Sequence, residues 1–150
     1  MLHSHPMTTI KRSALVPYSS RQMFELVNAV EDYPRFLQWC RKSHVISRDD
    51  KEVKATLEIA WRGIHKSFTT CNILHPFEHI EITLLKGPFR HLEGRWSFIE
   101  LHPTACKVCL DLEFELMGHL VDFAFNPVFN HIANSLVDAF CKHAAEVYGN

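Results

Sequence analysis

The sequence predicts an α+β fold in which a long C-terminal helix covers the apolar face of an antiparallel sheet of about six to seven strands. From about residue 44 to residue 117, hydrophobic residues recur with a period of two, which is typical of half-buried antiparallel strands. Helical periodicity returns over residues 121–150, the one segment long and apolar enough to cover such a sheet. The length suits a single domain over residues 1–150.

The N-terminal part predicts one strand and two short helices. Residues 1–8 are expected to form a flexible leader, and the run TTIKRSALV is expected to be the first strand. In RQMFELVNAV the apolar residues recur at helical spacing, with Ser19 or Ser20 available as the N-cap. Pro34 is expected to keep Tyr33 out of a helix and to begin a brief second helical turn.

The central region predicts strands that are joined in sequence as a meander. In CKVCLDLEFEL the apolar residues at alternate positions point one way and the charged residues between them point the other. Turn-forming residues separate the strands near Asp49-Asp50, Gly63, His75-Pro76, Gly87-Pro88 and His102-Pro103.

The stretch LLKGPFRHLEGRW, residues 84–96, predicts a strand, a loop and a second strand. Gly87, Pro88 and Gly94 mark the loop. Phe89 and Leu92 lie inside it, where polar residues would suffice. They either complete a core or close over a ligand.

The terminal helix carries an apolar stripe that would face the sheet, namely Phe125, Phe129, Ile132, Leu136, Phe140 and Val147. Gly149 is placed to end this helix. Pro127 either kinks it or lies in its first turn, and Asn126 is a possible N-cap that favours the second arrangement.

Charge and cysteine content narrow the functions that we expect. With 16 Lys plus Arg against 17 Asp plus Glu, the net charge is −1, so we expect no DNA partner, and any nucleic-acid contact needs a local patch. The 5 Cys form no compact framework, which favours a reducing cytoplasm. No apolar run approaches the roughly 20 residues of a membrane-spanning helix.

Motifs for catalysis or metal binding are weak. Cys106 and Cys109 lie three apart on a strand, so their thiols point to opposite sides. His75 and His79 fit a hairpin tip better than a metal site. The acidic residues of the last strand are expected on its solvated face, so we expect no enzyme, no metal and no cofactor. Polar residues with a possible buried role are Asn72, His91, Glu93, Arg95, His131 and Asn134.

Six segments carry a resemblance to a known family: SALVPYSSRQMFELVNAVEDYPRFLQWC, FTTCN, GPFRHLEGRWSF, ACKV, LEFE and PVFNHIANSLVDAFCKHAAEVY. Together, from about Thr9 to Tyr148, they resemble the bacterial RatA and coenzyme Q-binding START-like proteins of the polyketide cyclase/dehydrase and lipid transport superfamily. The resemblance implies a helix-grip fold, a curved sheet around the terminal helix that encloses a pocket for a lipid-like molecule. It also implies two different activities, ubiquinone binding in respiration and blocking of ribosomal subunit association through the large subunit.

We therefore expect first a non-enzymatic protein that binds a hydrophobic small molecule, ubiquinone or a related isoprenoid lipid, with peripheral membrane contact to collect it. Core packing alone also explains the apolar residues involved, because a cavity would use the same types. In this reading Phe89 and Leu92 form a lid over the ligand. The expected ligand-binding residues are Phe36, Leu37, Trp39, Trp61, Phe68, Phe89, Leu92, Trp96, Phe98, Phe114, Phe129 and Phe140.

The alternative is a ribosome association toxin that contacts the large subunit through cationic side chains. Its expected contact residues are Arg41, Lys42, Arg62, Lys66, Arg90 and Arg95, which could converge near one rim and bind phosphates. A polyketide cyclase-like enzyme comes third, because no acid/base pair is evident in the sequence.

Overall fold

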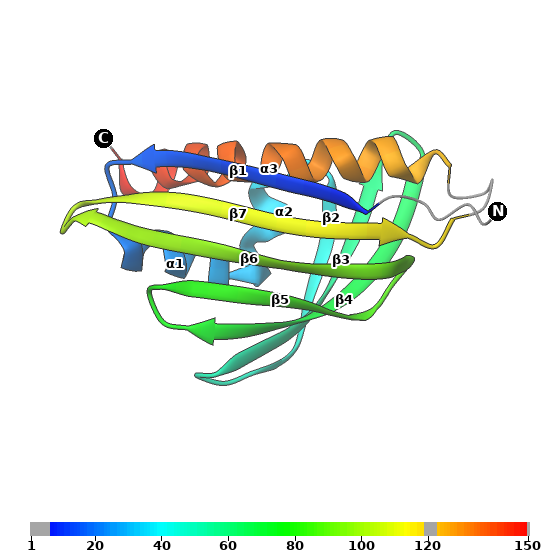
Figure 1. Cartoon of the computed structure of the whole chain (residues 1–150), viewed down its shortest axis with the longest axis horizontal. Helices are drawn as coiled ribbons and strands as arrows, with labels where there is room; N and C mark the ends of the chain where they lie inside the picture. Colours follow the sequence, from blue (N-terminus) through cyan, green and yellow to red (C-terminus); the bar gives the residue numbers. More distant parts are fainter. Residues whose placement is uncertain (1–6, 119–122, 150) are drawn as a thin grey trace.

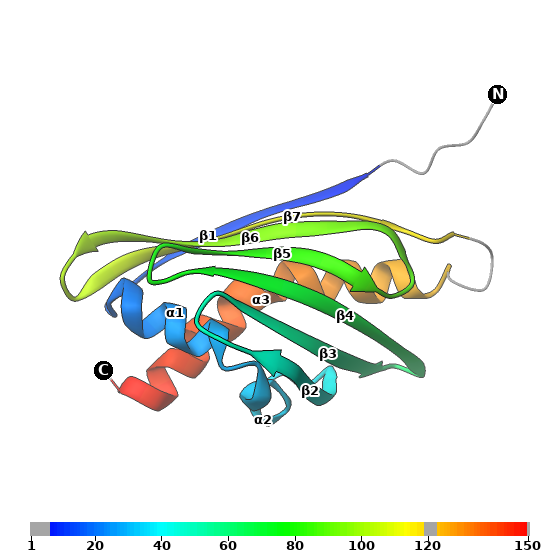
Figure 2. The same cartoon turned by 90° about the horizontal axis from the view of Figure 1, so that it is seen from below.

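The structure, a computed structural model, describes residues 7–118 and 123–149. Seven antiparallel strands form one sheet in the order β1-β7-β6-β5-β4-β3-β2. The sheet curls around the long helix α3, and the short helices α1 and α2 lie on the same side of it (Figures 1 and 2). The bounds are β1 Thr8–Val16, α1 Ser20–Asn28, a 3-10 turn Val30–Asp32, α2 Tyr33–Phe36, β2 Cys40–Arg48, β3 Glu52–Trp61, β4 Ile64–His75, β5 His79–Lys86, β6 Phe89–His102, β7 Ala105–Leu116 and α3 Phe125–Tyr148. The expected helix-grip architecture is confirmed.

The N-terminal elements follow the expected order with two corrections. Thr8, which belongs to both the expected leader and the expected first strand TTIKRSALV, is paired with Phe114 as the first residue of β1, while residues 1–6 lie outside the described part of the chain. Ser19 caps α1 through a capping box with Gln22. Tyr33 is helical and begins α2, contrary to expectation. Pro34 follows it in the first turn, where a missing N–H breaks no helical hydrogen bond.

Strand alternation is confirmed most clearly in β7. All the apolar positions from Cys106 to Leu116 are buried, and the intervening residues are exposed or half-buried. The period-two region begins earlier than expected, because β2 starts at Cys40. There the backbone N–H of Ala60 donates to the Trp39 oxygen at 2.9 Å, which continues the ladder beyond β2.

The stretch expected to form a loop after Gly87 is largely strand. β6 starts at Phe89, and Gly94 lies inside it, paired with both Ile82 and Leu112. Arg90 is an extra residue in β6 that forms a bulge. Phe89 pairs with Leu116, and His91 pairs with Glu115, the neighbour of Leu116 on β7, so Arg90 has no pairing partner of its own on β7. Phe89 and Leu92, although three apart, therefore both face the core, at 4% exposure each. The expected loop is therefore strand, with Phe89 and Leu92 built into the sheet, and their contact with a ligand stays a prediction.

Helix α3 covers the concave face of the sheet through most of its predicted stripe. Pro127 lies in the first turn of α3, which confirms the second of the two expected arrangements. The N-cap is Ala124, however, and Asn126 is inside the helix. Gly149, with φ 79°, ends the helix. Val147 does not belong to the buried stripe, since it is 51% exposed. The last turn instead packs on α1 through Tyr148, whose hydroxyl donates to the Gln22 backbone oxygen at 2.9 Å.

Candidate functional site: the α3 cleft

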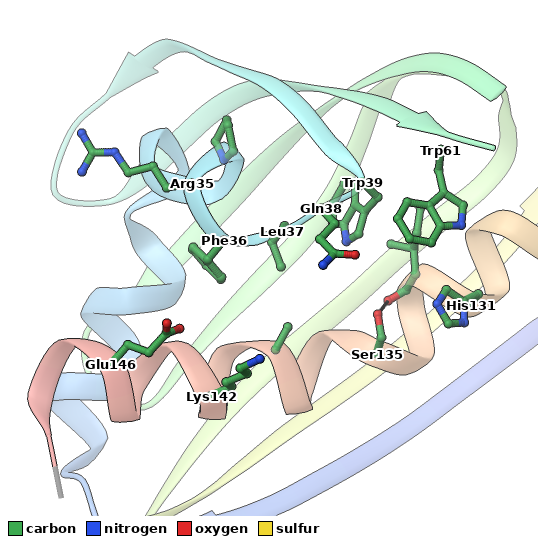
Figure 3. Close-up of a pocket in the computed structure, with 13 residues that line it drawn as sticks. Arg35, Phe36, Leu37, Gln38, Trp39, Trp61, His131, Ser135, Lys142 and Glu146 are labelled. Carbon is green, nitrogen blue, oxygen red and sulfur yellow. Dashed lines mark hydrogen bonds between the residues drawn. The ribbon is translucent and has the colours of Figure 1, made fainter. Parts of the chain in front are cut away.

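A cleft of about 600 Å³ separates α3 from the segment that joins α2 to β2. We call it the α3 cleft, and Figure 3 shows the side chains of the two walls facing each other. Its volume is within the range of small-molecule sites, about 300–1,000 Å³. The cleft is lined by Pro34, Arg35, Phe36, Leu37, Gln38, Trp39, Trp61, His131, Ile132, Ser135, Ala139, Lys142 and Glu146.

The first wall is a short segment that backbone hydrogen bonds hold in place. The Leu37 N–H donates to the Tyr33 oxygen at 2.9 Å, and the Cys40 N–H donates to the Leu37 oxygen at 3.0 Å. Leu37 and Trp39 are consequently turned into the protein, at 3% and 8% exposure, while Gln38 between them stays exposed. The wall therefore presents an apolar surface with a polar edge.

The second wall is one face of α3. Its residues are spaced by three or four, which places them on a single side of a helix, and they are His131, Ser135, Ala139, Lys142 and Glu146. Ser135 and Ala139 are small, and this leaves space for the cleft. The Ser135 hydroxyl donates to the Ile132 backbone oxygen at 2.9 Å, so its one proton is already in use.

Aromatic stacking fixes both ends of the cleft. At one end Trp61 stacks on His131 with ring centroids 6.1 Å apart, and the Arg62 guanidinium lies 5.6 Å from the Trp61 ring. At the other end Phe36 stacks on His143 at 3.8 Å with almost parallel planes and meets Phe140 edge-on at 5.2 Å. These contacts tie β3 and α2 to α3.

One polar atom of the cleft is left without a partner. The indole Nε1 of Trp39 is out of contact with solvent and makes no hydrogen bond within the described residues. An N–H in this state costs about 1–3 kcal/mol. A ligand whose carbonyl or ether oxygen reached Nε1 after a small rotation of the indole would satisfy it, whereas a pure hydrocarbon would not.

The cleft has little that could perform chemistry. Its single carboxylate is the exposed Glu146, so no pair of carboxylates meets among the residues that line it. Next to the wall, burial and then the Glu58 charge raise the pKa of the Cys40 thiol to about 12, which keeps it protonated and weakly nucleophilic. The arrangement suits binding better than acid/base or nucleophilic catalysis.

Four of the twelve predicted ligand residues line the cleft: Phe36, Leu37, Trp39 and Trp61. The other eight are packed in the core and do not line it, namely Phe68, Phe89, Leu92, Trp96, Phe98, Phe114, Phe129 and Phe140. Phe89, for example, meets the rings of Phe68 and Phe129 at 5.8 and 4.9 Å. These eight side chains are buried among other residues of the described ranges, and the α3 cleft lies beside them.

Sequence analysis missed most of the α3 wall, apart from His131, which it considered only as a buried polar residue. A signal was present in the spacing of Ser135 and Ala139, two small residues four apart on the face next to the apolar stripe. The spacing of these small residues indicates a cleft only when the α2–β2 segment is known to lie opposite this face of the helix, and the sequence does not show that.

The predicted cationic residues fall into two groups. Arg41, Lys42, Arg62 and Lys66 lie near the β3–β4 turn, since Cys40 and Lys66 both pair with Ile59. Arg90 and Arg95 lie apart from them on β6 and are paired with Glu115 at 3.7 Å and with Glu81 at 2.9 Å. The single rim that we expected is therefore divided.

Two further observations bear on function. No helix in the described ranges is long and apolar enough to cross a membrane. The model of the family described as polyketide cyclase/dehydrase and lipid transport matches residues 16–141.

The chain belongs to this family. Ribosome association toxin RatA of Pseudomonas aeruginosa is 45% identical over 95% of this chain and 99% of that protein. A more distant relative is the mitochondrial coenzyme Q-binding protein COQ10 homolog B of Xenopus laevis, 26% identical over 91% of this chain and 58% of that protein.

Solved structures of the family's fold agree with the architecture. The Zhui aromatase/cyclase of a Streptomyces species superimposes with a TM-score of 0.81, at 15% identity, over 93% of this chain and 94% of that one. A START superfamily protein of Mycobacterium smegmatis gives 0.76, at 19% identity, over 93% and 98%. At such identities the likeness establishes the fold alone.

Proposed function

We propose that the protein is a ribosome association toxin that acts in the cytoplasm, binds the large ribosomal subunit and blocks its association with the small one. The observation that carries the proposal is the 45% identity to RatA over nearly the full length of both chains. The similarity to a coenzyme Q-binding protein is weaker, at 26%, so the order expected from the sequence is reversed. The activity is binding, with no reaction and no cofactor.

A group of cations near the β3–β4 turn supports this proposal. We define the β3–β4 cationic group as Arg41, Lys42, Arg62 and Lys66. Arg62 is at the tip of the turn with φ 50° and is followed by Gly63 at φ 81°, as in a two-residue hairpin turn with both central residues left-handed. Within the described residues, Arg62 and Lys42 are in ion-pair contact with no carboxylate, so both are available to phosphates.

The test is co-sedimentation with purified 50S subunits, followed by subunit association on sucrose gradients. The wild type should bind and lower the yield of 70S ribosomes. The double variant Lys42→Glu/Arg62→Glu should bind at least tenfold more weakly. Lys51→Glu is the matched control, because Lys51 lies in the β2–β3 turn at the opposite end of the same strands.

Salt dependence separates phosphate contacts from other surfaces. The logarithm of the binding constant should decrease as the logarithm of the salt concentration increases, with a slope of about 0.7–0.9 for each phosphate neutralised. Loss of two contacts should reduce this slope by about 1.5 in the double variant. Unchanged affinity and slope would exclude the β3–β4 cationic group from the interface, and absence of wild-type binding would refute the proposed function.

A second function is favoured by one specific observation, the unpaired Trp39 Nε1 in the α3 cleft. We propose that the cleft holds an apolar molecule with an oxygen acceptor, of which ubiquinone or a related isoprenoid lipid is an example. Native mass spectrometry of the protein from its own host, followed by solvent extraction, tests this directly. A retained molecule without any oxygen acceptor, or an empty cleft after incubation with short-chain ubiquinone, would contradict it.

A further inference from the structure

We infer that His91, Glu93 and Glu113 form a binding site for a divalent transition-metal ion, Zn²⁺ in the first instance, on the outer face of the sheet. This face is opposite the one that α3 covers, and the site takes no part in the proposed function. The three side chains offer ligand atoms that all lie within 4.8 Å of one another. One nitrogen and two carboxylate oxygens are ligands that Zn²⁺ accepts, and a fourth position remains for water.

The backbone places these groups together. Residues two apart on a strand share a face, so His91 and Glu93 both point outward from β6. Glu113 on β7 lies directly opposite Glu93 in the register. The bulge at Arg90 accounts for the outward direction of His91, because in an unbroken alternation Phe89 and His91, two residues apart, would share one face.

The distances match the geometry of the metal. The His91 Nε2 lies 3.4 Å from an oxygen of Glu93 and 3.4 Å from an oxygen of Glu113. A tetrahedral Zn²⁺ with bonds of about 2.0–2.1 Å holds its ligand atoms about 3.3–3.4 Å apart. The imidazole nitrogen is thus one tetrahedral edge away from each carboxylate, with space between them for the ion.

Two further features favour the binding of a cation by these side chains. The His91 Nε2 is shielded from solvent and makes no hydrogen bond within the described residues. Glu93 and Glu113 are like charges directly across two strands, which is unfavourable on its own. The neighbouring cations Lys11 and Arg95 do not offset this repulsion between the two carboxylates. Lys11 pairs with Asp111 at 3.8 Å, and Arg95 pairs with Glu81 at 2.9 Å.

The surroundings leave the fourth position accessible. Glu93 and Glu113 also line a groove of about 530 Å³ on the outer face. The hydroxyl-bearing residues Thr83 and Thr9 pair with them on the flanking strands. A water or a small oxygen ligand can therefore complete the coordination from the groove.

A second cluster, His75, His79 and Glu81, is less suitable for one ion. Its two imidazoles stack at 4.1 Å with planes 24° apart, so their nitrogen lone pairs run side by side and do not converge. Glu81 also accepts a hydrogen bond from Arg95 at 2.9 Å. This cluster is therefore the natural control.

The experiment is a calorimetric titration of chelator-treated full-length protein with ZnCl₂, repeated with Co²⁺ while its absorption spectrum is recorded. The wild type should bind one ion at His91, and Co²⁺ should show tetrahedral bands without thiolate charge transfer. His91→Ala should lower the affinity at least about 100-fold, since even changes outside the ligand shell cost roughly 10–100-fold. Glu113→Gln should lower it at least about tenfold, and His79→Ala should leave it unchanged.

Thermal unfolding provides the check on folding. Without metal, His91→Ala and Glu113→Gln should melt at or slightly above the wild-type temperature, because each variant removes an unfavourable feature of the metal-free cluster. Added zinc should raise the melting temperature of the wild type and His79→Ala only. Zinc affinity that survives His91→Ala, is lost in His79→Ala, or is accompanied by thiolate bands would overturn the proposal.

Discussion

The unpaired indole nitrogen of Trp39 leads to a prediction about stability that differs from the usual result for a buried tryptophan. Trp39→Phe removes ring volume, which destabilises the protein, but it also removes an N–H that has no partner. Trp96→Phe removes the same volume at a site of similar burial, 4% against 8% exposure, where the nitrogen is not an unpaired buried donor. The difference in destabilisation between the two variants therefore measures the free-energy cost of the unpaired N–H of Trp39.

The size of the difference follows from the cost of a buried unpaired donor, about 1–3 kcal/mol. Trp39→Phe should therefore be less destabilising than Trp96→Phe by about that amount. In a domain of this length, each kcal/mol corresponds to about 2–4 °C in melting temperature. Trp39→Phe should at the same time weaken binding of an oxygen-containing ligand by roughly two- to tenfold, since it removes one hydrogen bond.

Urea unfolding of both variants measures the free-energy difference, provided that their m-values agree. Equal destabilisation would show that the Trp39 nitrogen is already satisfied in the free protein, for example by water. The cleft would then have no unpaired donor with which to select ligands that carry an oxygen acceptor. Unchanged ligand affinity in a folded Trp39→Phe protein would count against it equally.

Three further predictions concern the sheet and the core. Gly94→Ala should destabilise the protein by about 1–3 kcal/mol in urea unfolding, because a Cβ would lie 2.7 Å from Leu112 Cδ1 and 2.8 Å from the Asp111 backbone oxygen; a neutral effect would mean that β6 and β7 can separate there. Phe129→Ala should cost about 3–5 kcal/mol, since its ring is 4% exposed among other aromatic rings; a smaller loss would indicate that the core can collapse. Burial raises the pKa of Cys40 from 9.0 to about 12. The buried neutral thiol therefore costs the folded state nothing below pH 9. Above pH 9 the unfolded chain loses this proton first, so the free energy of unfolding falls as the pH rises toward 12. Cys40→Ala should reduce the alkaline slope of unfolding free energy by about 1 kcal/mol per pH unit, and an unchanged slope would contradict the assigned burial effect.

The fold could be predicted from the sequence where one periodicity extends over a whole element. In β7 the apolar residues alternate without interruption, and every one of them is buried. In β6 the bulge at Arg90 shifts the alternation by one residue. The apolar residues there do not follow a strict period of two, so the segment resembled a loop in the sequence. Tyr33 was misjudged because its preference to avoid a helix before proline is weaker than the packing of its ring, 5.3 Å from Phe140.

The site was only partly predictable, because it depends on contacts between distant segments. Phe36 and Trp39 were predicted as ligand-binding residues from the pocket that the family resemblance implies, and they line the cleft. Phe114 and Phe129 have the same character and pack against each other at 4.8 Å instead. Nothing local distinguishes the two pairs, since the difference lies in which segment is opposite each residue in the folded chain.

The additional residue in β6 interrupts the alternation of the strand without changing which side chains reach its two faces. Deletion of Arg90 would leave Phe89 directly before His91, with Phe89 facing the core and His91 facing outward, as they do now. The bulge therefore absorbs one residue locally. A related chain that is one residue shorter at this point can present the same aromatic cluster and the same outward histidine.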